Sequence, residues 1–387
     1  MAVLALGCAG HSETTLLQGG KTAFAAGKLP QARAYFEEQV TRFPQGLWVL
    51  QGKTYLARIQ LKQGDAMGGL ATLDDALASS PSDSLGQVSA LYWRGRIAFV
   101  LHRNDEALSA FSQVAVTARA EAEPATYFQG RALYRLGTSE SARAVLAARL
   151  VSGASFQNGT HYWLARALYA NGQCDRALDE LAQVNAASTW RAGADLYALR
   201  CALQQSRATT QTVFLLHQFA ADHPGSRLTD LALLLEGEAL VQVKDFAAAR
   251  ALLSEFPRLF PGSLYLDAAA FWSARAAAQL GDCVVARTEL TALLARRPRN
   301  NPFAPAIHLT VGECFYREGA LASAQVELEG LLARTPGSRW VPETHFALVK
   351  VNADLGQCAA ARAHALAIPA SSPFGALASG YLVAKGC

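Results

Sequence analysis

The sequence predicts an all-α fold: an α-solenoid of about ten helical hairpins, closed by one capping helix at the C-terminal end. Three observations support this prediction: a repeat of 35 to 38 residues, apolar residues at helical spacing, and few β-branched residues. Each repeat has a turn position, found at Gly27, Gly64, His102, Gly137, Gly172, Arg207, Lys244, Gly281, Gly319 and Gly356. A small residue follows five positions later, at Ala32, Gly69, Ala107, Ala142, Ala177, Ala249, Ala286, Ala324 and Ala361, with Thr212 as the exception. A period of this size is typical of stacked helix pairs, so a binding scaffold is the leading interpretation and an enzyme the minor one.

Composition and charge exclude several classes of protein. The 387 residues are 51% hydrophobic, and the net charge is only +4. The one local basic cluster is Arg296, Arg297 and Arg299, which we interpret as a solvated loop because a nucleic-acid site needs a broad basic face. No apolar run approaches the roughly 20 residues that span a bilayer.

The repeat from Asp230 to Pro261 shows how each hairpin is built. Its first half carries apolar residues at helical spacing, namely Leu231, Leu234, Leu235, Ala239 and Leu240. Val243-Lys244-Asp245 interrupts this pattern, and a second apolar stripe follows with Phe246, Ala249, Leu252 and Leu253. Two stripes of period 3.6 joined by a short turn predict a helical hairpin.

Glycine and proline mark the close contacts and the ends of the hairpins. Gly recurs in the first helices, at Gly20, Gly95, Gly130, Gly237 and Gly312. Because Gly inside a helix costs up to about 1 kcal/mol relative to Ala, its recurrence indicates a packing need. Pro lies 17 residues after the turn position at Pro44, Pro81, Pro224, Pro261, Pro298 and Pro336, where it is expected to end the second helix.

These residues resemble the tetratricopeptide repeat, with its small residue, turn Gly, Ala, large apolar residue and Pro at fixed spacing. The first repeat reads Gly20, Gly27, Ala32, Phe36 and Pro44, and the ninth reads Gly312, Gly319, Ala324, Leu328 and Pro336. The resemblance implies a right-handed superhelix. Its Pro-Gly-Ser linkers are most similar to bacterial periplasmic members, the lipoproteins of the β-barrel assembly and Tol–Pal-associated coordinator types. The aromatic residue at the fourth position is mostly absent, and the sixth repeat departs at Arg207 and Thr212.

The repeat also predicts how the chain is organised. Residues 1–12 precede the repeats as a truncated signal and tether, 13–222 hold repeats one to six, and 223–387 hold repeats seven to ten. A final helix starts at about Phe374, and the whole is expected to form one continuous solenoid.

Six of the seven cysteines occupy a repeated register. Cys174, Cys283 and Cys358 each lie two residues after a turn, and another Cys follows 27, 31 or 29 residues later. In a stacked hairpin array the end of the next first helix lies beside that position, so the expected disulfides are Cys174–Cys201, Cys283–Cys314 and Cys358–Cys387. Disulfides persist in oxidising compartments. The alternative is buried thiols, and no C-x-x-C spacing favours zinc or another metal.

The seventh cysteine lies near the N-terminus. Ala5-Leu6-Gly7-Cys8 resembles a bacterial lipobox, in which the cysteine is lipidated, although the usual Leu at Ala5 and the basic region are missing. Ala9 after the cysteine favours sorting to the outer membrane. The expectation is lipidation at Cys8 and a periplasmic, outer-membrane location; the alternative is a plain apolar terminus.

A ladder of aromatic and arginine residues runs along the first helices of repeats three to six. Its members are Tyr92, Arg96 and Phe99, then Tyr127, Arg131 and Tyr134, then Tyr162, Arg166 and Tyr169, and finally Tyr197. Residues at i, i+4 and i+7 share one helix face, and in the family that face lines the concave groove. Tyr and Arg carry much of the binding energy at interfaces, so an extended acidic peptide or a C-terminal tail is the expected partner. The alternative is a structural role, with Tyr packed between helices. The ladder fades beyond the sixth repeat, where Glu238 and Arg275 take the arginine position, which leaves room for a second surface.

No motif assigns a chemical step. Gly20-Lys21-Thr22 and Gly52-Lys53-Thr54 lack the leading Gly of a phosphate loop, and no nucleophile elbow or H-E-x-x-H motif occurs. No catalytic residue, metal or cofactor is therefore expected. The predicted function is a non-catalytic scaffold that binds envelope proteins near a membrane. The alternatives are a superhelix related to peptidoglycan-processing enzymes, a peptidoglycan-binding module, and a cytoplasmic scaffold.

Overall fold

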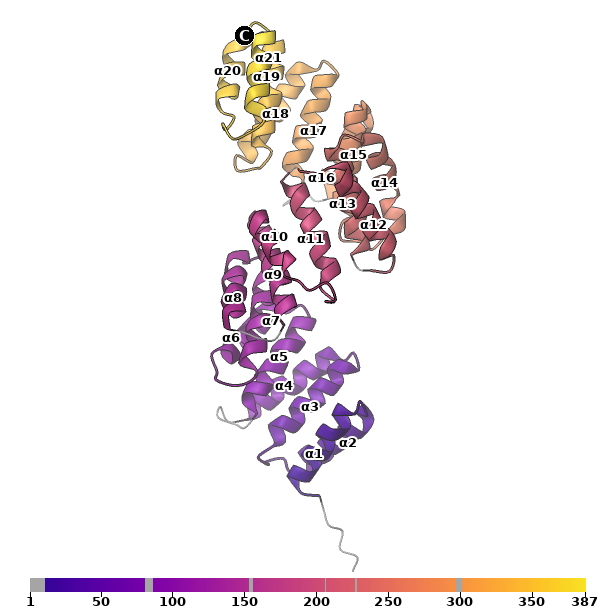
Figure 1. Ribbon diagram of the computed structural model, residues 1–387, viewed down its shortest axis with the longest axis vertical. Coiled ribbons are helices and arrows are strands. Elements are labelled where there is room, and N and C mark those ends of the chain that lie inside the picture. Colours follow the sequence, from indigo (N-terminus) through magenta and orange to yellow (C-terminus); the bar gives the residue numbers. More distant parts are fainter. Residues whose placement is uncertain (1–10, 81–85, 153–155, 206, 227, 297–300) are drawn as a thin grey trace, which may run out of the picture. The chain divides into compact units, whose positions relative to one another are not determined.

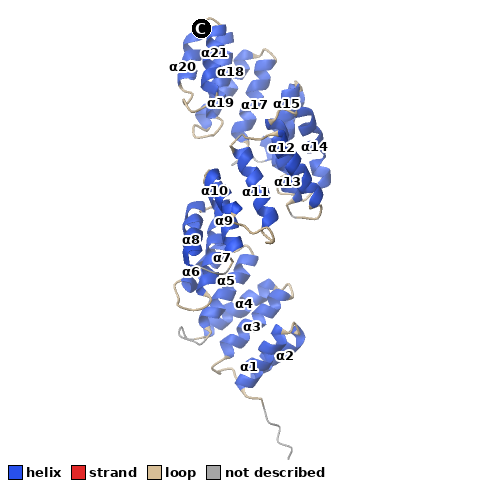
Figure 2. Cartoon of the chain, viewed as in Figure 1, coloured by secondary structure: helices blue, strands red, loops and turns tan. Residues whose placement is uncertain are grey.

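The computed structural model describes residues 11–80, 86–152, 156–205, 207–226, 228–296 and 301–387. Within these residues the chain forms 21 helices and no strand (Figures 1 and 2). The prediction of an all-α fold is confirmed. No helix in the described ranges is both long and apolar enough to cross a membrane.

The helices divide into two compact units, residues 1–201 and 202–387, each described by itself. The first unit contains α1 (Glu13–Ala25), α2 (Leu29–Arg42), α3 (Val49–Lys62), α4 (Ala66–Ser79), α5 (Gln87–Val100), α6 (Asn104–Ala115), α7 (Ala122–Arg135), α8 (Ser139–Ser152), α9 (Gln157–Ala170), α10 (Cys174–Ala182) and most of α11 (Arg191–Gln204). The second contains α12 (Thr210–Asp222), α13 (Thr229–Gln242), α14 (Phe246–Leu259), α15 (Leu266–Leu280), α16 (Cys283–Arg296), α17 (Ala304–Arg317), α18 (Leu321–Arg334), α19 (Val341–Asp354), α20 (Cys358–Leu366) and α21 (Phe374–Ala384). The division lies in α11, within the sixth repeat.

Consecutive helices pack as hairpins in both units. Five hairpins, α1–α2 to α9–α10, form the first unit, and four, α13–α14 to α19–α20, form the second. Between them, α12 packs on α13, and Thr212 serves a capping box with Thr209 where the other repeats have a small residue. The threonine that replaces the usual small residue in the sixth repeat therefore helps to cap the start of α12.

Nine of the ten predicted turn positions, all except Arg207, are recorded with left-handed backbone geometry, which reverses the chain between the two helices of a hairpin. The φ angle is 74° at Gly27 and 100° at Gly281. His102 and Lys244 occupy the same position with φ of 61° and 68°, although a side chain makes this conformation less favourable. The turn is thus imposed by the packed hairpin and not only by glycine.

The glycines inside the first helices are packing contacts. A Cβ at Gly20 would lie 2.5 Å from the Phe36 ring, and one at Gly237 would lie 2.5 Å from Leu253. Gly95, Gly130 and Gly312 meet a large apolar residue of their second helix in the same way. The two helices of a hairpin approach so closely that no side chain fits between them, which explains the recurrence of glycine.

The C-terminal helix α21 is held by side chains of α19 and α20. The Tyr381 hydroxyl donates to Asp354 Oδ1 at 3.0 Å, and Lys385 Nζ lies 2.7 Å from the same oxygen. A disulfide joins Cys387 to Cys358, with a Cα–Cα distance of 5.1 Å. This helix covers the apolar side of the last hairpin, as a capping helix does.

Candidate functional site: an arginine ladder in the first unit

Five arginines lie among aromatic rings along the first helices of the first unit. We call Arg58, Arg96, Arg131, Arg166 and Arg200 the arginine ladder; they come from α3, α5, α7, α9 and α11. The register of 35 residues places equivalent residues of consecutive first helices side by side. Each arginine can therefore contact rings of its own helix and of a neighbouring first helix.

Each arginine of the ladder makes a cation–π contact with a nearby aromatic ring. The Arg96 guanidinium carbon lies 4.1 Å from the centre of the Phe128 ring, and Arg166 lies 4.1 Å from Trp163. Arg131 lies 4.8 Å from Trp163. Each such contact contributes about 0.5–2 kcal/mol, more when water is excluded.

The two ends of the arginine ladder repeat the same geometry. Arg58 lies 4.2 Å from Trp93, and Arg200 lies 4.7 Å from Tyr169. The contacts therefore continue along the whole set of first helices from α3 to α11.

The tyrosines of the predicted ladder lie in the core. Tyr92, Tyr127, Tyr162 and Tyr197 are 7%, 1%, 5% and 4% exposed, and Phe99 is 5% exposed. Tyr134 and Tyr169 are half-buried. The rings pack between neighbouring helices, which is the structural alternative for these residues. Two of their hydroxyls accept hydrogen bonds from the arginine ladder. Arg96 Nη1 donates to the Tyr92 hydroxyl at 2.9 Å, and Arg200 Nη1 donates to the Tyr197 hydroxyl at 3.3 Å.

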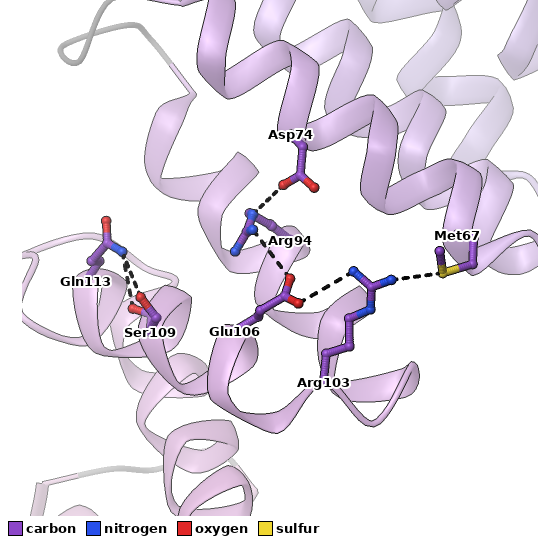
Figure 3. Close-up of polar contacts among 7 residues, drawn as sticks. All are labelled: Met67, Asp74, Arg94, Arg103, Glu106, Ser109 and Gln113. Carbon is purple, nitrogen blue, oxygen red and sulfur yellow. Dashed lines mark hydrogen bonds and ion pairs between the residues drawn. The ribbon is translucent and has the colours of Figure 1, made fainter.

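Four of the ladder arginines differ from several other arginines of the unit in their counter-charges. Within the described ranges, Arg58, Arg96, Arg131 and Arg166 form no ion pair with a carboxylate. Arg94, only two residues from Arg96, lies 2.6 Å from Asp74 and 3.6 Å from Glu106 (Figure 3). Carboxylates of α4 and α6 therefore neutralise Arg94 of α5, whereas Arg96 of the same helix has no such partner among the described residues.

The uncompensated charges act on one another. Burial lowers the pKa of Arg131, and the positive charges of Arg96 and Arg166 lower it further, against the opposing effect of Tyr127. Burial, followed by the charges of Arg131 and Arg166, also lowers the pKa of Arg135. The ladder is thus a row of like charges in a partly buried setting, where an anion is favoured.

Stacking leaves donors available for such an anion. A ring covers the face of a guanidinium, but its N–H groups point outward in the plane and suit the fork of a carboxylate. Arg58, Arg96, Arg131 and Arg166 are half-buried, so part of each side chain stays exposed. The ladder can therefore accept carboxylates at a spacing fixed by the repeat.

Several ladder contacts could have been found in the sequence. Trp93, Phe128 and Trp163 each follow a ladder tyrosine directly and recur at the same 35-residue spacing. Arg58 and Arg200 come three residues, not four, after Tyr55 and Tyr197. A search at both i+3 and i+4 would have included them, because both positions share a helix face.

The structure brings the predicted cysteine pairs together. Cys283 and Cys314 form a disulfide with a Cα–Cα distance of 5.3 Å, as do Cys358 and Cys387. Cys174 and Cys201 are both buried, 2% and 0% exposed, and their thiols interact. Burial, together with the hydrogen bond between the two thiols, raises the pKa of the Cys201 thiol. Cys8 lies outside the described residues, and within them no group of His, Cys, Asp and Glu could hold a metal ion.

The solved structures similar to this chain include the following three. A chain of the anaphase-promoting-complex heterotetramer Cut9–Hcn1 is 14% identical, with 96% of this chain and 88% of that chain covered and a TM-score of 0.38. The tetratricopeptide-repeat domain of P58(IPK) is 15% identical, with 89% and 98% covered and a TM-score of 0.30. Yeast Tom70 is 11% identical, with 97% and 95% covered and a TM-score of 0.41. None of these likenesses bears on function at such scores.

The comparison with protein families rests on sequence. No curated protein matches the chain at a significant level. The family model of the tetratricopeptide repeat matches residues 54–124 and 267–339, one stretch in each unit. These repeats bind protein partners and indicate a scaffold for protein–protein interaction. Helical hairpins lie in both units, and a family match in each identifies tetratricopeptide repeats over these two stretches of the chain.

Proposed function

We propose that this protein is a non-catalytic scaffold of the bacterial cell envelope that holds an extended acidic segment of a partner protein on its arginine ladder. The observation that carries the proposal is the set of four partly buried arginines with no carboxylate partner among the described residues. A partner segment with carboxylates at suitable spacing supplies the missing counter-charges and relieves the repulsion between neighbouring arginines. Aromatic stacking holds the guanidinium groups in place before the partner binds, so little side-chain entropy is lost on binding.

A fluorescent peptide of alternating Glu and Ala residues tests the charge requirement, with alternating Lys and Ala as the opposite charge. The triple variant Arg96→Gln, Arg131→Gln, Arg166→Gln should weaken binding of the acidic peptide by at least about tenfold, because charge-assisted hydrogen bonds contribute roughly 1.5–3 kcal/mol each. The matched control changes three exposed arginines of the same unit, Arg33→Gln, Arg42→Gln and Arg176→Gln. Equal binding by both triple variants would refute the assignment of the site to the arginine ladder.

We also propose a lipid anchor at Cys8 and a location on the periplasmic side of the outer membrane. The register of paired cysteines supports an oxidising compartment, and the lipobox-like Ala5-Leu6-Gly7-Cys8 supports an anchor. Two acyl chains or an equivalent second signal are needed for stable attachment. Cys8→Ser should release the protein from envelope membranes, and mass spectrometry of the mature N-terminus should show a diacylated or triacylated Cys8. An unmodified terminus in membrane-free fractions would contradict the anchor.

A further inference from the structure

The second unit contains a cavity that the arginine ladder does not use. Its volume is about 530 Å³, within the roughly 300–1,000 Å³ typical of small-molecule sites. It is lined by the end of α11, by α13, α15 and the start of α19, and by the segment before α21. Trp272, Trp340 and Phe374 give it three aromatic walls.

One charged side chain at the cavity is buried and has an unused donor. Arg275 is only 8% exposed, and its guanidinium stacks 4.6 Å from the Trp340 ring. Its Nη2 donates to Glu343 Oε1 at 3.0 Å, but within the described ranges its Nη1 has no hydrogen-bond partner. A buried donor without a partner costs free energy, which a bound oxygen would recover.

An unused acceptor lines the same cavity. Gln242 Nε2 donates to the Leu203 carbonyl at 3.0 Å, which fixes the amide. Its buried Oε1 has no hydrogen-bond partner in the described part of the chain. The cavity therefore offers one fixed donor and one fixed acceptor between aromatic walls.

The charges around the cavity cancel. Arg275 and Arg339 line it together with Glu238 and Glu343. Burial raises the pKa of Glu343, and the neighbouring Glu313 raises it further, while Arg275 and Lys350 lower it. Two arginines and two glutamates thus line the site, so it favours neither an anion nor a cation.

We propose that this cavity binds a neutral saccharide. A sugar hydroxyl both donates and accepts, so one ring can satisfy Arg275 Nη1 and Gln242 Oε1 together. The C–H face of the same ring packs against the aromatic side chains that line the cavity. A hydrocarbon ligand would leave both polar atoms unsatisfied, and an acidic peptide would meet Glu343 and Glu238.

The cavity differs from the arginine ladder in its charge balance and in the unit that contains it. Four members of the arginine ladder have no carboxylate partner among the described residues, whereas Arg275 is already paired with Glu343. The two sites lie in different units and take different ligands. The saccharide site therefore stands whether or not the ladder binds an acidic peptide.

Titration of the full chain with maltotriose and with tri-N-acetylchitotriose tests the proposal, by calorimetry and tryptophan fluorescence. At least one trisaccharide should bind at millimolar concentration or below. The double variant Arg275→Met, Glu343→Gln removes the donor without leaving a buried charge and should weaken binding by at least about tenfold. Trp340→Phe keeps an aromatic wall, so it should bind by calorimetry while losing much of the fluorescence change.

The matched control is Arg250→Met, Glu289→Gln, which removes another ion pair of the second unit, at 2.7 Å, away from the cavity lining. It should bind the trisaccharide as the unaltered chain does, and circular dichroism should show both double variants folded. Binding of neither trisaccharide overturns the proposal, and so does equal binding by the two double variants. Loss of acidic-peptide binding in the cavity variant, with no sugar binding, also overturns it and assigns the cavity to a protein partner.

Discussion

The guanidinium carbon of Arg96 on α5 lies 4.1 Å from the centre of the Phe128 ring on α7, so the contact joins two consecutive hairpins. A double-mutant cycle with Arg96→Met and Phe128→Leu should give a coupling energy of about 0.5–2 kcal/mol in the free energy of unfolding. Denaturant unfolding of the four proteins measures it. The same cycle with Arg94→Met and Phe128→Leu serves as the control, because Arg94 is paired with Asp74 instead. A coupling energy near zero at Arg96 would mean that stacking contributes nothing to stability.

Gly237→Ala should destabilise the second unit, although Ala is the better helix former. The new Cβ would lie 2.5 Å from Leu253, and overpacking of this kind typically costs about 1–3 kcal/mol. Gly380→Ala, in α21 with open space around it, is the control and should stabilise by up to about 1 kcal/mol. Thermal unfolding measures both. A stabilised Gly237→Ala variant would contradict the close approach of α13 and α14.

The last hairpin should lose stability in mild acid. His345 and His364 face each other with their Nδ1 atoms 3.0 Å apart, and burial lowers both pKa values. A neighbouring charge also shifts the pKa of each ring: that of His364 lowers the pKa of His345, and that of Glu329 raises the pKa of His364. Because the folded-state values lie below the unfolded value of about 6.5, the unfolded chain binds more protons there. The stabilising contribution is therefore present above pH 6.5 and is lost as the pH falls below it.

His364→Glu should reverse this pH dependence. His161–Glu180 and His308–Glu327 have the same separation of 19 residues and are hydrogen-bonded at 2.7 and 2.5 Å. A glutamate at 364 gives His345 the same kind of partner, so its pKa rises and stability increases below pH 6.5, less a small cost from Glu329. Hydrogen exchange of α19 and α20 between pH 5 and 8 measures the change. Parallel pH profiles of the two proteins would rule out the histidine pair as the cause.

Cys174 and Cys201 should be cross-linked in protein from an oxidising compartment. The link closes a loop of 27 residues and is expected to stabilise by roughly 3–4 kcal/mol on the loop-entropy model. Non-reducing peptide mapping should show the joined peptides, and Cys174→Ser, Cys201→Ser should unfold at lower denaturant concentration. Reduction of the unaltered protein is the control. Recovery of both residues as alkylated thiols from such a source would argue against the oxidised pair.

The turns and the close helix contacts of this fold could be predicted from the sequence because the same pattern recurs in each repeat. The turn at Lys244 and the packing glycine at Gly237 follow from a register that recurs along the chain, whatever residue fills one copy. The division in α11 was not predicted, because it depends on contacts in three dimensions and not on the residue pattern of the repeat. Arg275 and Glu343 lie 68 residues apart, skip a whole repeat and meet only through the arrangement of the second unit. A one-dimensional period carries no information on contacts of that range.

The bond between Cys358 and Cys387 lies where a linear array is weakest. In such an array the outermost helix has a neighbour on one side only, so it frays first and exposes the rest in turn. The disulfide ties the segment after α21 back to the start of α20, so fraying of α21 cannot carry it away from the preceding hairpin while the bond is intact. Local unfolding of this helix and redox state are thereby coupled at a single bond.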